Sequence, residues 1–330
     1  MQKSFRAFRI HEQDGRIAAR FDTIGLDELA AGEVVVKVRY STINYKDALA
    51  ATGAGRILRR YPLVGGVDLA GSVESSQDAR FKPGDEVLVT GCGLSETHDG
   101  GYAEYARLKA EWVIPVPKGL SLADTMRIGT AGFTAALAID RMERNRQQPT
   151  QGPVVVTGAT GGVGSLAIDM LAGRGYEVVA VSGKPEADAY LTGIGARRVL
   201  RRQDIKPAKR PLEAVEWAGA IDNVGGETLG WLTRTVGFYG NIASIGLAQG
   251  VELNTTVMPF ILRGVSLLGI NSVANPRAER LKLWERLATD LKPRHLAQIC
   301  HRTIGLDALP AAFADYVAGK VLGRTLVEVA

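Results

Sequence analysis

The feature of this sequence that most constrains its fold is a change of hydrophobic pattern at Pro153. From there to Ile270, apolar runs of strand length (PVVVT, EVVAVS, AGAIDNV, GNIASIGL and VSLLGI) alternate with helical or loop segments. Such alternation is typical of a parallel sheet whose strands are joined by helices. With RRVL (197–200) as a weaker sixth strand, the order predicts an α/β, doubly wound Rossmann domain that binds a nucleotide.

The turn TGATGGVG (157–164) has the context of a dinucleotide-binding fingerprint, because it joins a buried-type strand to a helix. Gly158 permits a tight turn, and Gly164 permits the helix to pack closely on the strand. The helix N-terminus adds unpaired N–H donors and partial positive charge for a pyrophosphate. A purely structural glycine turn is the alternative. The residues predicted to contact the cofactor here are Thr160, Gly161, Gly162, Val163 and Gly164.

The end of the second strand indicates which cofactor binds. Folds specific for NAD place an Asp or Glu about 20 residues after the glycines, where it accepts from the ribose 2′-hydroxyl. This chain instead has Ser182, Gly183 and Lys184, and Arg198 starts the next expected strand. A carboxylate would repel a 2′-phosphate, whereas Ser, Lys and Arg side chains can bind one, so NADPH is predicted. The alternative is that Lys184 and Arg198 are solvated surface charges.

Polar and glycine residues end the next two strands. Asn223 ends the fourth run, and Gly246 and Leu247 end the fifth. Ligands of such sheets bind at the carboxyl ends of the strands. The three residues are therefore predicted neighbours of the ribose and nicotinamide, although each position also suits turn chemistry.

Residues 1–125 are β-rich. Short alternating runs such as VVVKVRYSTI, VDLAGSVES and DEVLVTG are separated by Gly, Pro and Asp turn signals, as an antiparallel barrel or sandwich requires. After Ile270 the chain has a helical segment and ends in the strand-like LGRTLVEV, which we expect to return to the first domain. We predict a catalytic domain of residues 1–125 and 271–330 and a cofactor domain of residues 126–270.

Charge and composition disfavour several classes of function. The formal net charge of +5 favours anionic partners, but the basic residues are scattered and not interleaved with aromatics, so nucleic acid is not expected as a partner. No apolar stretch is long enough for a membrane span. The N-terminal segment has charges where a signal peptide is apolar, and 2 cysteines cannot build a disulfide framework. A reducing cytoplasm is the predicted location.

Several segments together resemble the medium-chain dehydrogenase/reductase superfamily. They are NYKDALAATGAGRI, FKPGDEVLVTG, IGTAGFTAALAI, TGATGGVGS, VVAVSGK, LEAVEWAGAIDNVGG, TTVMPFILRGVSLLGINS and GRTLVEV. Within it the chain is similar to the zinc-independent quinone-oxidoreductase branch and, more narrowly, to the acryloyl-CoA reductase group. The resemblance covers the whole chain. It implies a GroES-like β-rich catalytic domain beside the Rossmann domain, a homodimer, and Asn271 and Ser272 as further cofactor contacts.

The same resemblance bears on zinc. Zinc alcohol dehydrogenases of this superfamily carry a Cys after the early strand and a Gly-His-Glu further on, where this chain has INYKD (43–47) and GGVD (65–68). His98 and Cys92 do not complete a set of three ligands with an open position. No metal is therefore expected. Without one, reduction of a conjugated C=C bond is favoured over oxidation of an alcohol.

The implied reaction is the reduction of acryloyl-CoA by NADPH to propionyl-CoA. Negative charge that develops on the thioester oxygen needs a hydrogen-bond donor. Tyr45, at the end of a strand, is the predicted donor and a cofactor contact, with packing in an interdomain seam as the alternative. Asn44 either supports the loop or contacts the substrate. Arg56, Arg59 and Arg60 form a cluster of the kind that binds CoA phosphates, with a solvated loop as the alternative.

Two other functions stay open. A quinone reductase would share every cofactor residue and would differ only in its substrate pocket. A non-enzymatic NADPH-binding protein, structural or associated with RNA, is compatible with the basic charge and disfavoured by the scatter of that charge.

Overall fold

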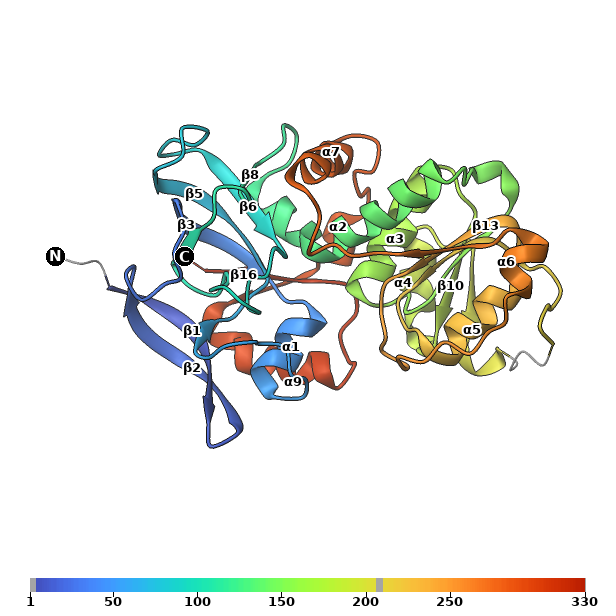
Figure 1. Ribbon diagram of the computed structural model, residues 1–330, viewed down its shortest axis with the longest axis horizontal. Helices are drawn as coiled ribbons and strands as arrows, with labels where there is room; N and C mark the ends of the chain where they lie inside the picture. The colour runs from blue at the N-terminus through green and yellow to red at the C-terminus, as the bar shows by residue number, and fades with distance from the viewer. Residues whose placement is uncertain (1–3, 206–209, 330) are drawn as a thin grey trace. The chain divides into compact units, whose positions relative to one another are not determined.

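The computed structural model of the protein describes residues 4–205 and 210–329 and is drawn in Figure 1. The described part of the chain divides into two compact units. Unit 1 contains the residues up to Thr130, residues 273–288 and those from Cys300 on, and unit 2 contains residues 131–272 and 289–299. The domain boundaries predicted from the sequence, after residues 125 and 270, stay predictions beside this division by contacts.

The segment 289–299 groups with unit 2 because it is bound to helix α3 (Gly162–Gly173). The buried Asp169 carboxylate of α3 lies 2.9 Å from His295 Nδ1 and accepts from the His295 backbone amide at 3.0 Å. A short helix follows His295 directly, so these bonds fix the start of that helix on α3.

A largely antiparallel sheet forms the centre of unit 1, in the order β15-β16-β3-β5-β6-β8, with β7 also paired to β3. In β3, the side chains of Val34, Val36 and Val38 are buried while Lys37 and Arg39 are exposed, so the period of two predicted for this run is confirmed. The strands are β3 (Val34–Thr42), β5 (Asp68–Ser76), β6 (Glu86–Thr90), β7 (Tyr105–Leu108), β8 (Ile114–Pro115), β15 (Arg302–Gly305) and β16 (Thr325–Glu328).

The prediction that the last strand returns to the first domain is confirmed. β16 pairs antiparallel with β3, and Leu326 lies opposite Thr42. Arg324, just before β16, is 2% exposed and donates from Nη1 to the Ile43 carbonyl at 3.1 Å and from Nη2 to the Thr42 hydroxyl at 2.7 Å. These bonds fix the last strand beside the end of β3.

A hairpin that the sequence pattern did not single out opens unit 1. Strand β1 (Ser4–Gln13) pairs along its length with β2 (Arg16–Gly25) and at two positions with β4 (Leu63–Val64). The helices of unit 1 are α1 (Tyr45–Thr52), α7 (Arg277–Ala288), α9 (Leu309–Val317) and the 3-10 turn η4 (Leu306–Ala308).

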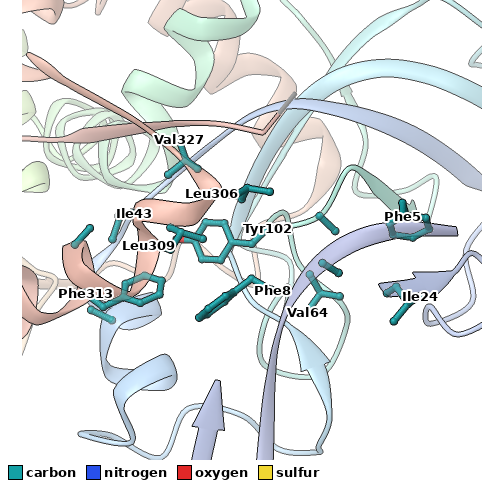
Figure 2. Packing of buried hydrophobic residues seen from close by; sticks show 14 of the residues in the cluster. Phe5, Phe8, Ile24, Ile43, Val64, Tyr102, Leu306, Leu309, Phe313 and Val327 are labelled. Carbon is teal, nitrogen blue, oxygen red and sulfur yellow. The ribbon is translucent and has the colours of Figure 1, made fainter. Parts of the chain in front are cut away.

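Figure 2 shows the apolar core that joins this hairpin to α9. The rings of Phe8, Tyr102 and Phe313 have centroids 5.8 to 6.4 Å apart. The Tyr102 hydroxyl donates to the Thr42 carbonyl at 3.0 Å, so the polar atom of this buried ring is satisfied. The core thus ties segments from both ends of the chain to the end of β3.

Unit 2 has the parallel sheet that the sequence predicts. Its order is β11-β10-β9-β12-β13-β14, and every neighbouring pair is parallel. The order changes direction between β9 and β12, which makes the sheet doubly wound and marks the point where ligands of such sheets bind. The strands are β9 (Val154–Val156), β10 (Val178–Ser182), β11 (Arg198–Arg201), β12 (Trp217–Asp222), β13 (Val236–Ser244) and β14 (Ser266–Gly269).

Helices precede, connect and follow these strands. They are α2 (Leu122–Arg144), which is interrupted at Gly129 and begins in unit 1, then α3, α4 (Asp188–Gly193), α5 (Gly226–Thr235), α6 (Met258–Arg263) and α8 (Leu296–Ile299), with 3-10 turns η1 (Pro149–Gln151), η2 (Pro185–Ala187) and η3 (Arg202–Asp204). Among the described helices, none has the length and apolar character that crossing a membrane requires.

Candidate functional site

In unit 2 the Gly-rich turn lies between β9 and α3, as predicted. Gly158 has a φ of 57°, a left-handed conformation that strains other residues. A Cβ on Gly164 would lie 2.4 Å from the Gly158 carbonyl oxygen, so only glycine lets α3 pack this closely on the turn. No described side chain caps α3, whose first amides therefore remain available to an anionic ligand.

A buried carboxylate at the end of β12 holds this turn. Asp222 accepts from the Thr157 hydroxyl at 2.7 Å and from the Gly225 amide at 2.8 Å. Burial raises the pKa of Asp222, and the hydrogen bonds from Thr157 and the nearby amides oppose that increase. The Thr157 hydroxyl in turn accepts from the Asn223 amide at 3.0 Å. The ends of β9 and β12 are thereby fixed to each other.

Asn223 and Gly246 meet next to the turn. A Cβ on Gly246 would lie 2.1 Å from the Asn223 carbonyl oxygen, so glycine is required there. Asn223 Nδ2 donates to the Thr157 carbonyl at 2.8 Å, while its Oδ1 is buried and has no hydrogen-bond partner in the described part of the chain. A buried acceptor without a donor fits a site where a ligand brings one, such as a ribose hydroxyl. Leu247, beside Gly246, is exposed.

The end of β10 carries the residues predicted to distinguish NADPH from NADH, and the structure adds Arg202 to them. Ser182 Oγ accepts from the Lys184 amide at 3.0 Å. A Cβ on Gly183 would lie 3.6 Å from Arg202 Cζ and Nε, so the guanidinium lies directly beside this glycine. The parallel register puts Arg201 opposite Ser182, which brings the following residue to the same edge of the sheet.

Arg198 is the first residue of β11, as predicted, but its position does not favour the predicted contact with the 2′-phosphate, which stays a prediction. Arg198 lies opposite Val179 at the start of β11, and its Cζ lies 5.5 Å from the centroid of the Trp217 ring. Three residues of strand, about 10 Å, separate it from the position opposite Ser182. The sequence ARRVLRR offers two arginine pairs, and the register of the parallel strands selects the second, with Arg202, for the ligand edge.

The other predicted cofactor residues of unit 2 gather at the carboxyl ends of the strands. They lie at or after the ends of β9, β10, β12, β13 and β14 in turn, and the last two, Asn271 and Ser272, come shortly after β14. Glycine turns, a free helix start, an unpaired buried acceptor and no carboxylate at residues 182–184 together fit a phosphorylated dinucleotide. The individual contacts of these residues with a cofactor stay predictions.

In unit 1 the cluster NYKD does not end a strand in a loop but opens helix α1. β3 ends at Thr42, and Asn44 is the N-cap of a helix whose first residue is Tyr45. Asp47 Oδ2 accepts from the Asn44 amide at 2.8 Å, and its Oδ1 accepts from the Val67 amide at 3.0 Å. Asn44 and Asp47 therefore support the local backbone, as an N-cap pair does.

The Asn44 side chain is also bound to the buried carboxylate of Asp68. Asn44 Nδ2 donates to Asp68 Oδ2 at 2.8 Å, the Thr130 amide donates to the same oxygen at 2.9 Å, and the Thr130 hydroxyl donates to Oδ1. Arg324 Nη1 donates to Asn44 Oδ1 at 3.0 Å. The polar side chains of Asn44, Asp47 and Asp68 are thus hydrogen-bonded within the protein itself.

Burial also makes stability depend on pH through Asp47. Desolvation raises its pKa from 3.8 to about 6, the amide of Asn44 opposes that shift, and the charge of Asp68 adds to it. Between these pH values the folded state holds a proton that the unfolded state has lost, so stability falls as pH rises, by up to about 1.4 kcal/mol per pH unit.

We expect the free energy of unfolding of the wild type to fall more steeply from pH 4 to pH 6 than that of Asp47→Asn. Urea titrations at several pH values measure the two slopes. The two proteins are compared by how steeply the free energy of unfolding changes with pH and not by its absolute value. The carboxamide that replaces the Asp47 carboxylate also offers one acceptor oxygen fewer to the Asn44 N–H, which lowers stability at every pH. If the free energy of unfolding of the wild type and of Asp47→Asn changed with pH in parallel, the raised pKa of Asp47 would be contradicted.

Tyr45 and the basic loop lie at the surface of unit 1. The Tyr45 side chain is 50% exposed. Arg56 and Arg59 are exposed, and Arg60 Nε donates to the Thr97 carbonyl at 2.9 Å. The structure brings Asn44 and Tyr45 together at one helix start, and their roles toward a substrate, with those of the three arginines, stay predictions.

Within residues 4–205 and 210–329, no group of three or more His, Cys, Asp or Glu side chains is arranged to hold a metal ion. Cys92 and Cys300 are both free thiols. The independence from zinc stays a prediction.

Comparison with protein families agrees with this architecture. Residues 30–118 match the family described as "Alcohol dehydrogenase GroES-like domain", and residues 162–289 match the one described as "Zinc-binding dehydrogenase". The first match covers the central strands of unit 1, and the second covers most of the parallel sheet of unit 2. The predicted fold class, a GroES-like β-rich domain with a Rossmann domain, is confirmed.

Curated relatives match over nearly their full length. Acrylyl-CoA reductase AcuI of Ruegeria pomeroyi is 47% identical over 319 residues, which is 96% of each chain. The putative quinone oxidoreductase YhfP of Bacillus subtilis is 45% identical over 329 residues, covering 99% of this chain and 100% of the relative.

Solved structures agree with the sequence matches. The yhdH oxidoreductase from Salmonella enterica in complex with NADP is 46% identical, has a TM-score of 0.96 and covers 98% of this chain and 100% of its own. The yhfP protein of Bacillus subtilis with NAD bound is 44% identical, has a TM-score of 0.96 and covers 99% and 100%. By this identity and coverage, the chain belongs to the medium-chain dehydrogenase/reductase superfamily, among its AcuI-type acrylyl-CoA reductases and quinone-oxidoreductase-like members.

Proposed function

We propose that this protein is an NADPH-dependent, zinc-independent oxidoreductase that reduces the C=C bond of a short 2-enoyl-CoA, with acryloyl-CoA as its main substrate. The observation that carries the proposal is the 47% identity with an acrylyl-CoA reductase over 96% of both chains. A relative crystallised with NADP has the same fold throughout, at a TM-score of 0.96.

The cofactor residues of unit 2 support NADPH. When bound, this cofactor supplies a hydride. The turn around Gly161 and the start of α3 would hold the pyrophosphate, and Ser182, Lys184 and Arg202 would hold the 2′-phosphate. Burial lowers the pKa of Lys184. The guanidinium of Arg202 therefore keeps its positive charge to a higher pH than the Lys184 amine does. Because the related yhfP was crystallised with NAD, the preference for NADPH is a quantity to be measured.

In the proposed reaction, addition of hydride to the β-carbon develops negative charge on the thioester oxygen, Tyr45 donates a hydrogen bond to that oxygen, and a proton from a side chain or water then reaches the α-carbon. The Asn44–Asp68–Arg324 bonds hold the helix start that carries Tyr45, so its backbone is fixed before a substrate arrives. Arg56, Arg59 and Arg60 would contact the charged end of CoA.

Tyr45→Phe should lower kcat with acryloyl-CoA by at least about tenfold, since a hydrogen bond to a charged oxygen contributes about 1.5–3 kcal/mol. Steady-state kinetics at saturating NADPH measure this. Tyr239→Phe is the matched control, because Tyr239 is 76% exposed in unit 2 and should leave kcat unchanged. An unchanged kcat in Tyr45→Phe would reduce Tyr45 to a packing role.

A quinone reductase is the second candidate, and the description of the relative YhfP as a putative quinone oxidoreductase favours it. Both functions use the same cofactor residues, so the substrate decides between them. NADPH oxidation should be measured side by side with acryloyl-CoA, crotonyl-CoA and a benzoquinone. A higher kcat/KM for the quinone would overturn the first proposal. No turnover with any of the three, together with salt-sensitive RNA binding, would favour a non-enzymatic role.

We further propose that the protein is a homodimer through the edge strand β14. Among the described strands, β14 lies at one end of the parallel sheet and carries the exposed Leu267, and the preceding helix α6 exposes Ile261 and Leu262. An open edge flanked by apolar side chains suits pairing with a second copy. Light scattering should give twice the 35.2 kDa of one chain, and a monomer at micromolar concentration would contradict the proposal. A cytoplasmic location is a proposal that cell fractionation tests.

A further inference from the structure

Unit 1 contains a cavity of about 530 Å³ that none of the predicted site residues lines. Its walls come from residues 92–97, from residues 111–112 and from residues 273–280 at the start of α7. The volume lies within the range of about 300–1,000 Å³ that is usual for small-molecule sites. The cavity is therefore large enough to take part of a ligand.

The wall formed by α7 brings two guanidinium groups to the cavity. Arg277 Nη1 donates to the carbonyl oxygens of Val113 and Glu111, and no carboxylate lies within ion-pair distance of it among the described residues. Arg280, one helical turn further, is 2% exposed and donates from Nη1 to the Thr90 carbonyl at 2.8 Å. Both arginines are held in place by the backbone and not by a mobile surface contact.

The acidic side chains of the cavity are paired with other cations. Glu96 is bound to Lys46, and Glu111 lies 3.2 Å from Arg80 Nη1. Each of these carboxylates thus has a cation partner other than the arginines of α7, although Glu111 also interacts electrostatically with Arg277. The charge that Arg277 brings to the cavity suits an anionic ligand.

A buried donor in the same wall points to a ligand as well. Asn275 Nδ2 is buried and has no hydrogen-bond partner in the part of the chain that the structure describes. Buried polar groups are nearly always hydrogen-bonded, so an orphan donor beside two guanidinium groups favours a ligand rich in acceptor oxygens. On the facing wall, Cys92 has a φ of 53°, and such strained residues cluster at binding sites.

The cavity shares a wall with the predicted substrate residues. Glu96 of that wall binds Lys46, the neighbour of Tyr45 in α1. Thr97, the next residue of the wall, accepts from Arg60 Nε at 2.9 Å. The start of α1 and the basic loop therefore lie directly behind the cavity wall within unit 1.

We propose that this cavity binds the phosphate-bearing end of the acyl-CoA substrate, with Arg277 and Asn275 as its main contacts and the basic loop of Arg56, Arg59 and Arg60 as a secondary one. The proposal rests on the proposed function and adds to it the place where the CoA moiety is recognised. Three features of the cavity suit this end of CoA: positive charge, a vacant donor and a position next to the residues predicted to hold the thioester.

The test compares acryloyl-CoA with S-acryloyl-N-acetylcysteamine, which has the same thioester and no phosphate. Arg277→Gln should raise KM for acryloyl-CoA about tenfold, because it removes a charged hydrogen-bond donor. It should leave KM for the truncated thioester and for NADPH within about twofold, which separates the phosphates of CoA from that of the cofactor. Asn275→Asp should act in the same direction by repelling a phosphate.

Lys282→Gln is the matched control. Lys282 lies on the same helix, is exposed and pairs only at the surface with Glu279 at 3.0 Å, so the variant removes one charge from α7 without touching the cavity. It should leave KM for acryloyl-CoA unchanged. An equal rise in Lys282→Gln and Arg277→Gln would overturn the proposal, because it would show a general effect of charge.

Failure of the cavity and failure of the proposed function give different results. If the wild type reduces acryloyl-CoA and Arg277→Gln has the same KM, the cavity proposal is wrong and the function stands. If the wild type reduces neither thioester, the proposed function is wrong. Equilibrium binding of free CoA and of pantetheine then tests whether the cavity binds the phosphate-bearing end of CoA. Weaker CoA binding in Arg277→Gln, with pantetheine unaffected, would support it; equal binding, or none in the wild type, would overturn it.

Discussion

The Arg202→Glu variant is expected to raise KM for NADPH by about 100-fold or more while changing KM for NADH by no more than about threefold. The guanidinium lies beside Gly183 at the end of β10, where a 2′-phosphate would sit next to Ser182. A charge-assisted hydrogen bond contributes about 1.5–3 kcal/mol, and about 1.4 kcal/mol corresponds to a factor of ten. Reversal of the charge adds repulsion to this loss.

Arg198→Glu is the control for this experiment. It makes the same change of charge on the same strand, but at the other end, where the guanidinium lies against Trp217. It should leave KM for NADPH within about threefold, because about 10 Å of strand separate it from the edge. An equal loss for NADPH and NADH in Arg202→Glu, or an Arg198→Glu variant impaired as strongly, would refute the role of Arg202. Steady-state kinetics measure KM for NADPH and for NADH in each of the two variants.

The second large effect is expected on stability. Asp68→Ala should lower the free energy of unfolding by about 3–5 kcal/mol, because it strips the buried partner from several donors at once. The lost bonds are those from Asn44 Nδ2 at 2.8 Å and from the amide and hydroxyl of Thr130. A Cβ on Gly129 would lie 2.9 Å from Asp68 Oδ2 and 2.5 Å from Arg324 Nη2, so the variant also removes a negative charge close to a buried guanidinium.

Calorimetry and urea unfolding measure this loss of stability. Two further variants, one milder change at the same site and one surface control, serve for comparison. Asp68→Asn keeps one acceptor oxygen and should lose less than Asp68→Ala. Asp307→Ala removes an exposed carboxylate that pairs with Arg6 at the surface, and it should not change the melting temperature measurably. A loss in Asp68→Ala as small as that in Asp307→Ala would mean that the network does not stabilise unit 1.

Local pattern was sufficient for the cofactor domain. The strand–turn–helix around TGATGGVG and the alternation of strands and helices were predicted, because each depends on hydrophobic periodicity and turn residues close together in the chain. The hairpin of β1 and β2 was not singled out. Helix α1 was taken for the end of a strand, since its 8 residues are too few to show a period clearly.

The residues of the candidate sites also divide into those that a local pattern predicts and those that it does not. The glycines, Ser182 and Asn223 could be named because they lie at or just after the ends of predicted strands. Arg202 could not be chosen over Arg198, because the choice depends on which residues of β10 and β11 lie opposite each other, and register belongs to the sheet and not to either strand alone.

By itself, the sequence determined the fold class, the superfamily and the edge of the parallel sheet where a cofactor would bind. Strand ends and glycine turns depend on residues that are close together in the chain. Only the tertiary structure decided which arginine stands at that edge and what Asn44 contacts. Arg324 reaches Asn44 across 280 residues of sequence, and Arg277 reaches the cavity from a helix that the sequence pattern linked to no site. Contacts between residues so far apart are set by folding, and no local pattern records them.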